Sequence, residues 1–184
     1  ISATGLSSKN YDLVYSDGGL TITPRAIVVG SAGAEKTYDG TREASSTAVI
    51  LNGNLVKDDQ LVGGSFVFDD MNAGTGKLIS VSDVSIEDGN AGQNYAVTYD
   101  TTANGTIHKA NLNISALDAS KTYDGEGWVG GQVQFDGFVA GESVTNLDGT
   151  LSWDGSSQGA VNAGDYVISA TGLSSKNYDL VYSD

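Results

Sequence analysis

The same seventeen residues, ISATGLSSKNYDLVYSD, occur twice in this chain. They span residues 1–17 and again residues 168–184, at an offset of 167 residues. An identical stretch of this length within 184 residues indicates that structural units are repeated in tandem.

The repeated stretch has the pattern of a β-strand followed by a turn. Tyr11, Leu13 and Tyr15 lie at every second position, which is the period of a strand with one face turned inward. Asp17-Gly18-Gly19 supplies turn residues, and Leu20-Thr21-Ile22-Thr23 is a second strand candidate, so we expect a β-hairpin here. A second hairpin is predicted where Asn104-Gly105 leads into Thr106 and Ile107.

Shorter motifs define a smaller unit inside the large repeat. KTYDG occurs at 36–40 and 121–125, NAG at 72–74 and 162–164, and NY at 94–95 and 177–178. Their spacing predicts a unit of about 84 residues with insertions in its loops. We expect residues 1–23 to be the terminal strands of a preceding repeat, 24–108 a complete repeat domain, and 109–184 a second repeat domain that lacks its last strand.

Short strand-like segments and turns fill each unit, and no window keeps a helical period for more than two turns. Twenty-five glycines and nine tyrosines fit many short strands joined by turns. The expected fold class is all-β, with tandem Ig-like β-sandwich domains that each form their own core. The alternative is a β-grasp-like repeat with one short helix, for which residues 55–61 are the best segment.

Composition excludes several classes of function. Nine Lys and Arg against 23 Asp and Glu give a net charge of −14, which repels nucleic acid and anionic lipid. The chain has no cysteine, so it has no disulfides, thiol nucleophiles or thiolate metal sites. No apolar run reaches the length of about 18 residues that insertion into a membrane needs. The one histidine, His108, belongs to no nucleophile–His–acid set, so we expect no enzymatic activity.

The motifs carry a family resemblance. KTYDG, NAGDYVISATGLSSKNYDLVYSD and the LTITP sequence at residues 20–24 together resemble the YDG/MBG-type tandem repeats of large bacterial surface proteins, notably filamentous-haemagglutinin-like adhesins exported by two-partner secretion. The resemblance spans the whole chain. It departs at Glu126, where the first unit has Thr41, and at Thr75-Gly76-Lys77, where the second unit has Asp165-Tyr166-Val167.

This resemblance implies an extracellular location, at the bacterial cell surface or secreted. It implies a structural stalk or spacer that projects a binding tip or supports cell–cell or biofilm adhesion, with neighbouring repeats of the same chain as partners. The alternative is an adhesive module that binds host or matrix glycans, or another copy of itself. Because residues 20–23 repeat the strand that the second unit lacks, we also expect head-to-tail contacts between chains in crystals.

Calcium is the only metal or cofactor for which the sequence offers candidate ligands. Asp69, Asp70 and Asn72 share one loop, and Asp88 and Asn90 share another. Hard oxygen ligands suit Ca²⁺, although neither loop has the spacing of an EF-hand. Acidic turns exposed to solvent are the competing interpretation.

A tryptophan in the second unit is a candidate for ligand stacking. Trp128 precedes a Gly-rich segment, and an exposed indole there could stack on a sugar ring. The competing interpretation is a tryptophan that packs in the core.

Lysine and asparagine residues at the two ends of each unit suggest a covalent hypothesis. Lys36 with Asn94, and Lys121 with Asn177, could form isopeptide bonds beside a carboxylate such as Asp39 or Asp124. The competing interpretation is that these are surface lysines and turn asparagines.

Overall fold

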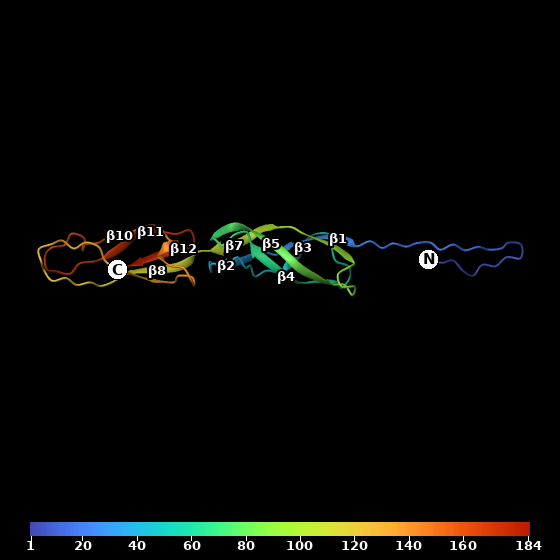
Figure 1. Ribbon diagram of the computed structural model, residues 1–184, viewed down its shortest axis with the longest axis horizontal. Coiled ribbons are helices and arrows are strands. Elements are labelled where there is room, and N and C mark those ends of the chain that lie inside the picture. The colour runs from blue at the N-terminus through green and yellow to red at the C-terminus, as the bar shows by residue number, and fades with distance from the viewer.

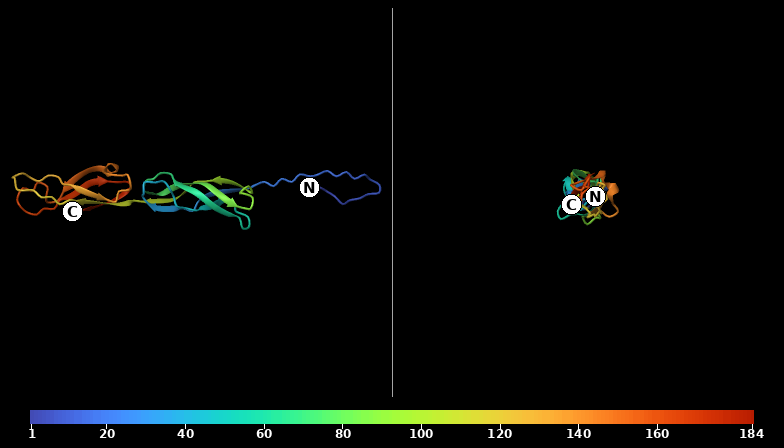
Figure 2. Two further views of the ribbon diagram at one scale, coloured as in Figure 1. Left: turned by 60° about the horizontal axis from the view of Figure 1, so that its bottom comes forward. Right: turned by 90° about the vertical axis from the view of Figure 1, so that its left-hand side faces the viewer.

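The computed structural model describes all residues, 1–184, as an extended rod (Figures 1 and 2). Two strand-rich units lie end to end, and residues 1–23 project beyond the first unit as an exposed tail without strands. The tail and the second unit therefore lie at opposite ends of the rod, with the first unit between them.

Seven strands make up the first unit. They are β1 (Arg25–Ser31), β2 (Ala34–Thr37), β3 (Ala48–Asn52), β4 (Gln60–Phe68), β5 (Gly74–Glu87), β6 (Tyr95–Tyr99) and β7 (Thr102–His108). One sheet has the order β3-β1-β6 and the other has the order β2-β7-β5-β4. β1 runs parallel to β6 and β2 parallel to β7, whereas the other neighbours are antiparallel. The unit is a two-layer β-sandwich.

Alternating apolar residues on the facing strands form the core of the first unit. Ile27 and Val29 come from one sheet, and Phe68, Ile79 and Ile107 come from the other; each is at most 1% exposed. Full burial of a side chain of this size stabilises the fold by about 1.5–3 kcal/mol.

The second unit repeats this plan with fewer strands. Its elements are β8 (Ala110–Ala116), β9 (Val133–Asp136), the single 3₁₀ turn η1 (Val144–Asn146), β10 (Asp148–Asp154), β11 (Ser169–Ser174) and β12 (Tyr178–Ser183). The sheet β9-β8-β12 repeats β3-β1-β6, including the parallel pair, and the pair β10-β11 corresponds to β4-β5. No strand of residues 1–184 pairs with the second edge of β11, whereas β7 pairs there with β5 in the first unit.

The all-β prediction is confirmed, and the β-grasp alternative is wrong. Residues 55–61 form a turn and the start of β4 instead of a helix, and Lys57 has a φ of 53°, outside the helical range. The 3₁₀ turn at η1 is the one helical element of the chain. No helix is long and apolar enough to cross a membrane.

Both hairpin predictions are wrong. Residues 1–23 form no strand, so no hairpin is present there. Asn104 and Gly105 lie inside β7, and β6 and β7 run in the same direction along the unit, beside β1 and β2. β6 and β7 belong to different sheets, so the chain crosses between layers without reversing where a hairpin was expected. Gly105 serves packing instead of a turn, because a Cβ atom there would lie 2.6 Å from Cε1 of Phe68.

Candidate functional site: the joint between the units

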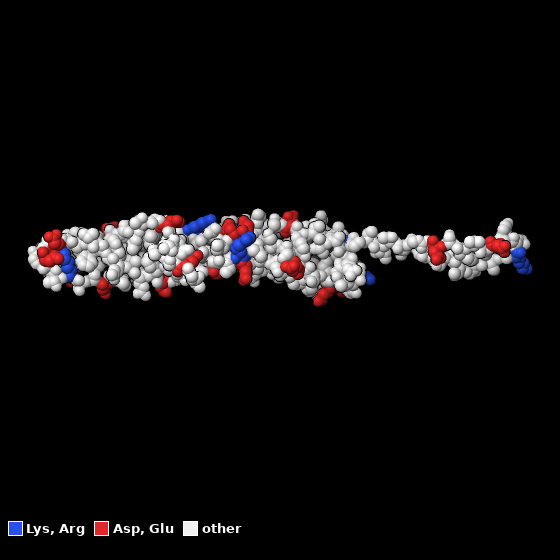
Figure 3. Space-filling view, in the orientation of Figure 1, with Lys and Arg blue, Asp and Glu red and all other residues white.

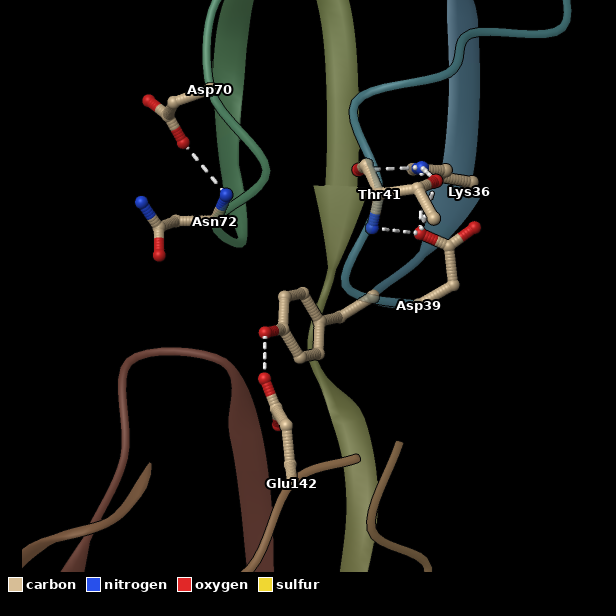
Figure 4. A network of polar contacts seen from close by, with 7 residues as sticks. Lys36, Asp39, Thr41, Asp70, Asn72 and Glu142 are labelled. Atoms are coloured by element: carbon tan, nitrogen blue, oxygen red, sulfur yellow. Dashed lines mark hydrogen bonds and ion pairs between the residues drawn. The ribbon is translucent and has the colours of Figure 1, made fainter. Parts of the chain in front are cut away.

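Two tyrosines and one glutamate connect the units, and Figure 4 shows Glu142 with the hydrogen bond that it accepts from the first unit. Tyr38 follows β2 in the first unit, and its hydroxyl donates a hydrogen bond of 2.5 Å to Oε1 of Glu142 in the second unit. Tyr178, the first residue of β12, donates to the other oxygen of the same carboxylate. The ring of Tyr178 also packs edge to face on Phe138, with centroids 5.7 Å apart. Tyr38 and Tyr178 are 5% and 2% exposed, so both tyrosines are buried at the joint, whereas Glu142 is partly exposed.

Burial and the glutamate keep both phenols protonated. Burial is the larger cause, and the hydrogen bond to Glu142 and its negative charge add to it, which raises the pKa of Tyr38 to about 12. Burial, followed by the hydrogen bond to Glu142, also raises the pKa of Tyr178. Both hydroxyls are therefore donors at neutral pH, and the carboxylate accepts from both.

Asparagine side chains extend the joint on its polar side. Oδ1 of Asn177 accepts a hydrogen bond of 3.0 Å from the backbone N–H of Ala73, and its Nδ2 lies 3.2 Å from Oδ1 of Asn72. These contacts bring the NAG loop of the first unit against the NY motif of the second.

The covalent connection across the joint is a single residue. β7 ends at His108 and β8 begins at Ala110, so Lys109 alone lies between them. The Nζ atom of Lys109 donates a hydrogen bond of 3.0 Å to the backbone oxygen of Ser175. A one-residue connection that is bonded to the second unit leaves little freedom for bending.

The buried apolar cluster does not stop at the boundary. Ala110, Leu112 and Tyr178 of the second unit belong to the same cluster as the core of the first unit. The expectation that each unit forms its own core is therefore too simple: no sheet is shared, but the apolar packing continues through the joint.

The KTYDG motif holds Tyr38 in place through a closed turn. Nζ of Lys36 donates to Oδ1 of Asp39 at 2.7 Å and to the backbone oxygen of Thr41 at 2.9 Å, and Asp39 also accepts from the N–H of Thr41 (Figure 4). Gly40 has a φ of 75°, a conformation that favours glycine. The hydrogen-bonded turn therefore fixes the position of the tyrosine in this motif.

The second KTYDG motif has the same turn but no partner for its tyrosine. Lys121 pairs with Asp124 at 2.8 Å and donates to the backbone oxygen of Glu126 at 2.7 Å. Glu126 replaces Thr41 without loss of the turn, because the backbone supplies the contact. Tyr123, the counterpart of Tyr38, is 67% exposed.

The outer end of the first unit has a tyrosine–carboxylate pair equivalent to Tyr178 and Glu142. Tyr95, the tyrosine of the first NY motif, donates a hydrogen bond of 2.5 Å to Asp59, as Tyr178 donates to Glu142. Each tyrosine also accepts a hydrogen bond from the backbone N–H three residues before that carboxylate, at 2.8 and 2.9 Å. The rod thus contains one assembled joint and, at its two ends, the two halves of another.

The first loop of calcium candidates is closed by a lysine. Nζ of Lys77 lies 3.4 Å from Asp69 and 2.8 Å from Asp70, and Lys77 is only 7% exposed. The hydrogen bond from Lys77 is the main cause that lowers the pKa of Asp70 to about 2, and the backbone N–H of Asn72 assists it. The protein's own cation therefore occupies the position that the sequence suggested for Ca²⁺.

The second candidate calcium loop is a turn in which backbone N–H groups donate to the aspartate. Asp88 accepts hydrogen bonds from the backbone N–H groups of Asn90, Gly92 and Asn94. Burial acts to raise the pKa of Asp88, but these donors outweigh it and lower the pKa below its ordinary value. No group of three or more acidic, histidine or cysteine side chains in residues 1–184 could hold a metal ion.

The Lys–Asn pairs of the isopeptide hypothesis are not brought together. Lys36 contacts Asp39 and Thr41 near the joint, whereas the backbone oxygen of Asn94 accepts from the N–H of Arg25 at the outer end of the unit. In the second unit, Lys121 binds Asp124 and Glu126, while Asn177 lies in the joint. Position early or late in a unit therefore does not predict contact in this fold.

Trp128 lies in a groove instead of on an open sheet face. It is partly buried, and its Nε1–H donates a hydrogen bond of 2.9 Å to the backbone oxygen of Gly130. Its ring lines a groove that also includes Tyr166 and Ile168. His108 is an exposed strand-end residue, with Nε2 3.6 Å from a carboxylate oxygen of Glu35.

Sequence reasoning missed Glu142, the central residue of the joint. Glu142 belongs to no motif, and its partner Tyr38 is 104 residues away in the chain. One signal was present: Asp59 precedes Glu142 by 83 residues, the same spacing that separates the two NY motifs.

Comparison with known proteins identifies one family model in each unit. Residues 23–103 match the family model of the YDG domain, and residues 112–184 match that of the MBG domain (YGX type). No curated protein and no solved structure matches the chain. The chain therefore contains a YDG domain followed by an MBG domain, joined through Tyr38, Glu142 and Tyr178.

Proposed function

We propose that this chain is a spacer segment of an extracellular bacterial surface adhesin, which carries a binding tip away from the cell or supports contacts between cells. Repeat domains in series increase length with each unit added, and the rod in Figure 2 has its units end to end. The two matched domains support a repeat module as the building block.

The joint is the observation that carries the proposal. A spacer must transmit position from one end to the other, which requires units that do not swing freely. The shared carboxylate of Glu142, the continuous apolar cluster and the one-residue connection at Lys109 together oppose bending.

Surface charge suits a crowded array of such rods. Acidic side chains are spread over both units and the tail in Figure 3, with few basic ones between them. A net charge of −14 makes neighbouring rods repel one another, most strongly at low ionic strength.

Distance measurements between spin labels on the two units test the stiffness. Because the chain has no cysteine, Ser85→Cys and Thr150→Cys place labels on exposed sites of the first and second unit. We expect a narrow distance distribution that broadens when Glu142→Ala removes the shared carboxylate, and no change with the exposed control Glu87→Ala. A broad distribution in the parent chain would contradict a spacer role.

A further inference from the structure

Two asparagines of the first unit are followed by glycine, and the fold holds them differently. The sequence contains Asn52-Gly53 and Asn104-Gly105 as its two Asn-Gly pairs. Because glycine has no side chain, its backbone nitrogen can approach the amide carbon of the preceding asparagine closely. Attack of that nitrogen is the first step of asparagine deamidation, so both pairs have the groups that this reaction requires.

The side chain of Asn52 lies against the nitrogen that attacks in this reaction. Asn52 is the last residue of β3, which is an edge strand of its sheet. The backbone N–H of Gly53 donates a hydrogen bond of 2.8 Å to Oδ1 of Asn52. The amide carbon that carries this oxygen is therefore beside the Gly53 nitrogen, and both residues are exposed to the water that completes the reaction.

The backbone around Asn52 is also weakly held. The register between β1 and β3 shifts just before Asn52, which pairs with Val28. Gly53 lies outside the strand and has a φ of 83°. A turn at the end of an edge strand opens at a lower cost in free energy than a position inside a sheet, so the rotation that closes the ring is accessible here.

Asn104 has the opposite setting. Its Nδ2, the atom that must leave, donates a hydrogen bond of 3.0 Å to the backbone oxygen of Ser31. Gly105 lies inside β7, opposite Ala34 of β2 and Lys77 of β5. The side chain of Asn104 is exposed as well, so access to water does not distinguish the two pairs, whereas backbone pairing and the bond to Ser31 do.

We propose that Asn52 is a site of spontaneous modification, at which the chain converts its own asparagine to aspartate and isoaspartate, while the fold protects Asn104. The Gly53 nitrogen forms a bond to Cγ of Asn52, the Cγ–Nδ2 bond breaks, and Nδ2 leaves as ammonia with the proton of the Gly53 N–H. Water then opens the five-membered imide. Hydrolysis at Cγ gives aspartate, and hydrolysis at the main-chain carbonyl carbon gives isoaspartate.

The aspartate product has a precedent in the second unit. Asp136-Gly137 stands at the end of β9, as Asn52-Gly53 stands at the end of β3, 84 residues earlier. Both glycines lie close to neighbouring backbone: an added Cβ would be 2.5 Å from the oxygen of Asn111 in the second unit and 2.8 Å from that of Ala26 in the first. The two turns are therefore equivalent, and an aspartate fits this position.

The isoaspartate product lengthens the main chain instead. Its backbone runs through Cβ and Cγ, which adds one methylene to the loop between Asn52 and Asp59. In that loop the N–H of Val56 donates a hydrogen bond of 2.8 Å to the hydroxyl of Tyr95, which itself donates to Asp59. Isoaspartate therefore displaces Val56 and loosens these contacts at the outer end of the unit.

Peptide mass spectrometry of the folded chain, incubated at mildly alkaline pH, tests the site. Deamidation exchanges an amide NH₂ for a hydroxyl, so the change in mass can be assigned to one peptide. We expect Asn52 to react at least about tenfold faster than Asn104, because the strand around Asn104 must open first. In urea that unfolds the chain, the two pairs should react at similar rates, which assigns the difference to the fold.

Two variants complete the test. Asn52→Gln cannot form the five-membered ring and should remove the change in mass from this peptide. Deuterium exchange at the N–H of Val56 should be at least about tenfold faster in the isoaspartate form than in the parent chain, whereas freshly prepared Asn52→Asp should exchange like the parent. Equal rates at Asn52 and Asn104 in the folded chain, or an Asn52 that stays intact, would overturn the proposed site. Unchanged exchange at Val56 in the isoaspartate form would overturn its effect on the loop.

Discussion

Tyr38 and Tyr178 meet edge to face across the boundary between the units, with ring centroids 5.5 Å apart and planes at 81°. Tyr38 belongs to the KTYDG motif and Tyr178 to the NY motif, so the two motifs that mark the repeat in the sequence form the two sides of one contact. A unit in a series needs one contact surface for each of its two neighbours. Each motif therefore supplies one side of the contact between neighbouring units.

Removal of the shared carboxylate should weaken the joint. Glu142→Ala leaves two buried phenol hydroxyls without their acceptor, and we expect a loss of about 2 kcal/mol in the free energy of unfolding, measured with urea. Glu142→Gln keeps an acceptor and should lose less. The exposed control Glu87→Ala should stay within about 0.5 kcal/mol of the parent chain. Equal stability of the Glu142 and Glu87 variants would show that the Glu142 carboxylate adds nothing to the free energy of unfolding.

High pH should destabilise the fold through the same tyrosines. The pKa of Tyr38 rises from 10.0 to about 12 on folding, so the unfolded chain loses this proton first. The stabilisation is complete below pH 10 and is lost as the pH rises towards 12. Tyr38→Phe has no such proton, so its stability should fall less between pH 9 and pH 12. Urea midpoints at several pH values measure this, and parallel curves for both proteins would contradict it.

Low pH should destabilise the fold by protonating Asp70. Its pKa is lowered from 3.8 to about 2 in the folded chain, so its contribution is present above pH 3.8 and is lost as the pH falls through 2. Asp70→Asn should cost at most about 1 kcal/mol at pH 7, because the carboxylate is half exposed, and should flatten the acid limb of the stability curve. The exposed Asp118→Asn is the control and should keep the acid limb of the parent chain. An unchanged acid limb in Asp70→Asn would assign the acid sensitivity to other carboxylates.

Strand positions could be predicted from the sequence, because alternation is a local signal. Phe66 and Phe68 lie at alternate positions of β4 and are buried, and Ile79 and Val81 repeat this pattern in β5. The partners of those strands could not be predicted. The short segment between β6 and β7 has the same local chemistry whether the next strand pairs with the last one or crosses to the other sheet.

The contacts of the joint could not be predicted from local sequence patterns, for a similar reason. KTYDG could be recognised as a motif, but the role of its tyrosine depends on Glu142, which approaches only when two units are stacked. The isopeptide hypothesis inferred closeness in space from order in the chain, but Lys36 lies near the joint beside Ile107, and Asn94 lies at the outer end of the unit beside Arg25.

Packing between Phe68 and Gly105 in the first unit provides a last prediction. A Cβ at position 105 would lie 2.6 Å from the Phe68 ring and 3.0 Å from the backbone oxygen of Lys77. Gly105→Ala should therefore cost about 1–3 kcal/mol by overpacking, measured by urea unfolding.

Phe68→Ala opens the space that a larger residue at 105 needs. The combination Phe68→Ala with Gly105→Leu should be more stable than the sum of the two single changes predicts, by about 1 kcal/mol or more. Gly30→Ala, which crowds Leu51 in the other sheet, should combine with Phe68→Ala additively. If the Phe68 and Gly105 changes are also additive, one residue does not fill the space of the other.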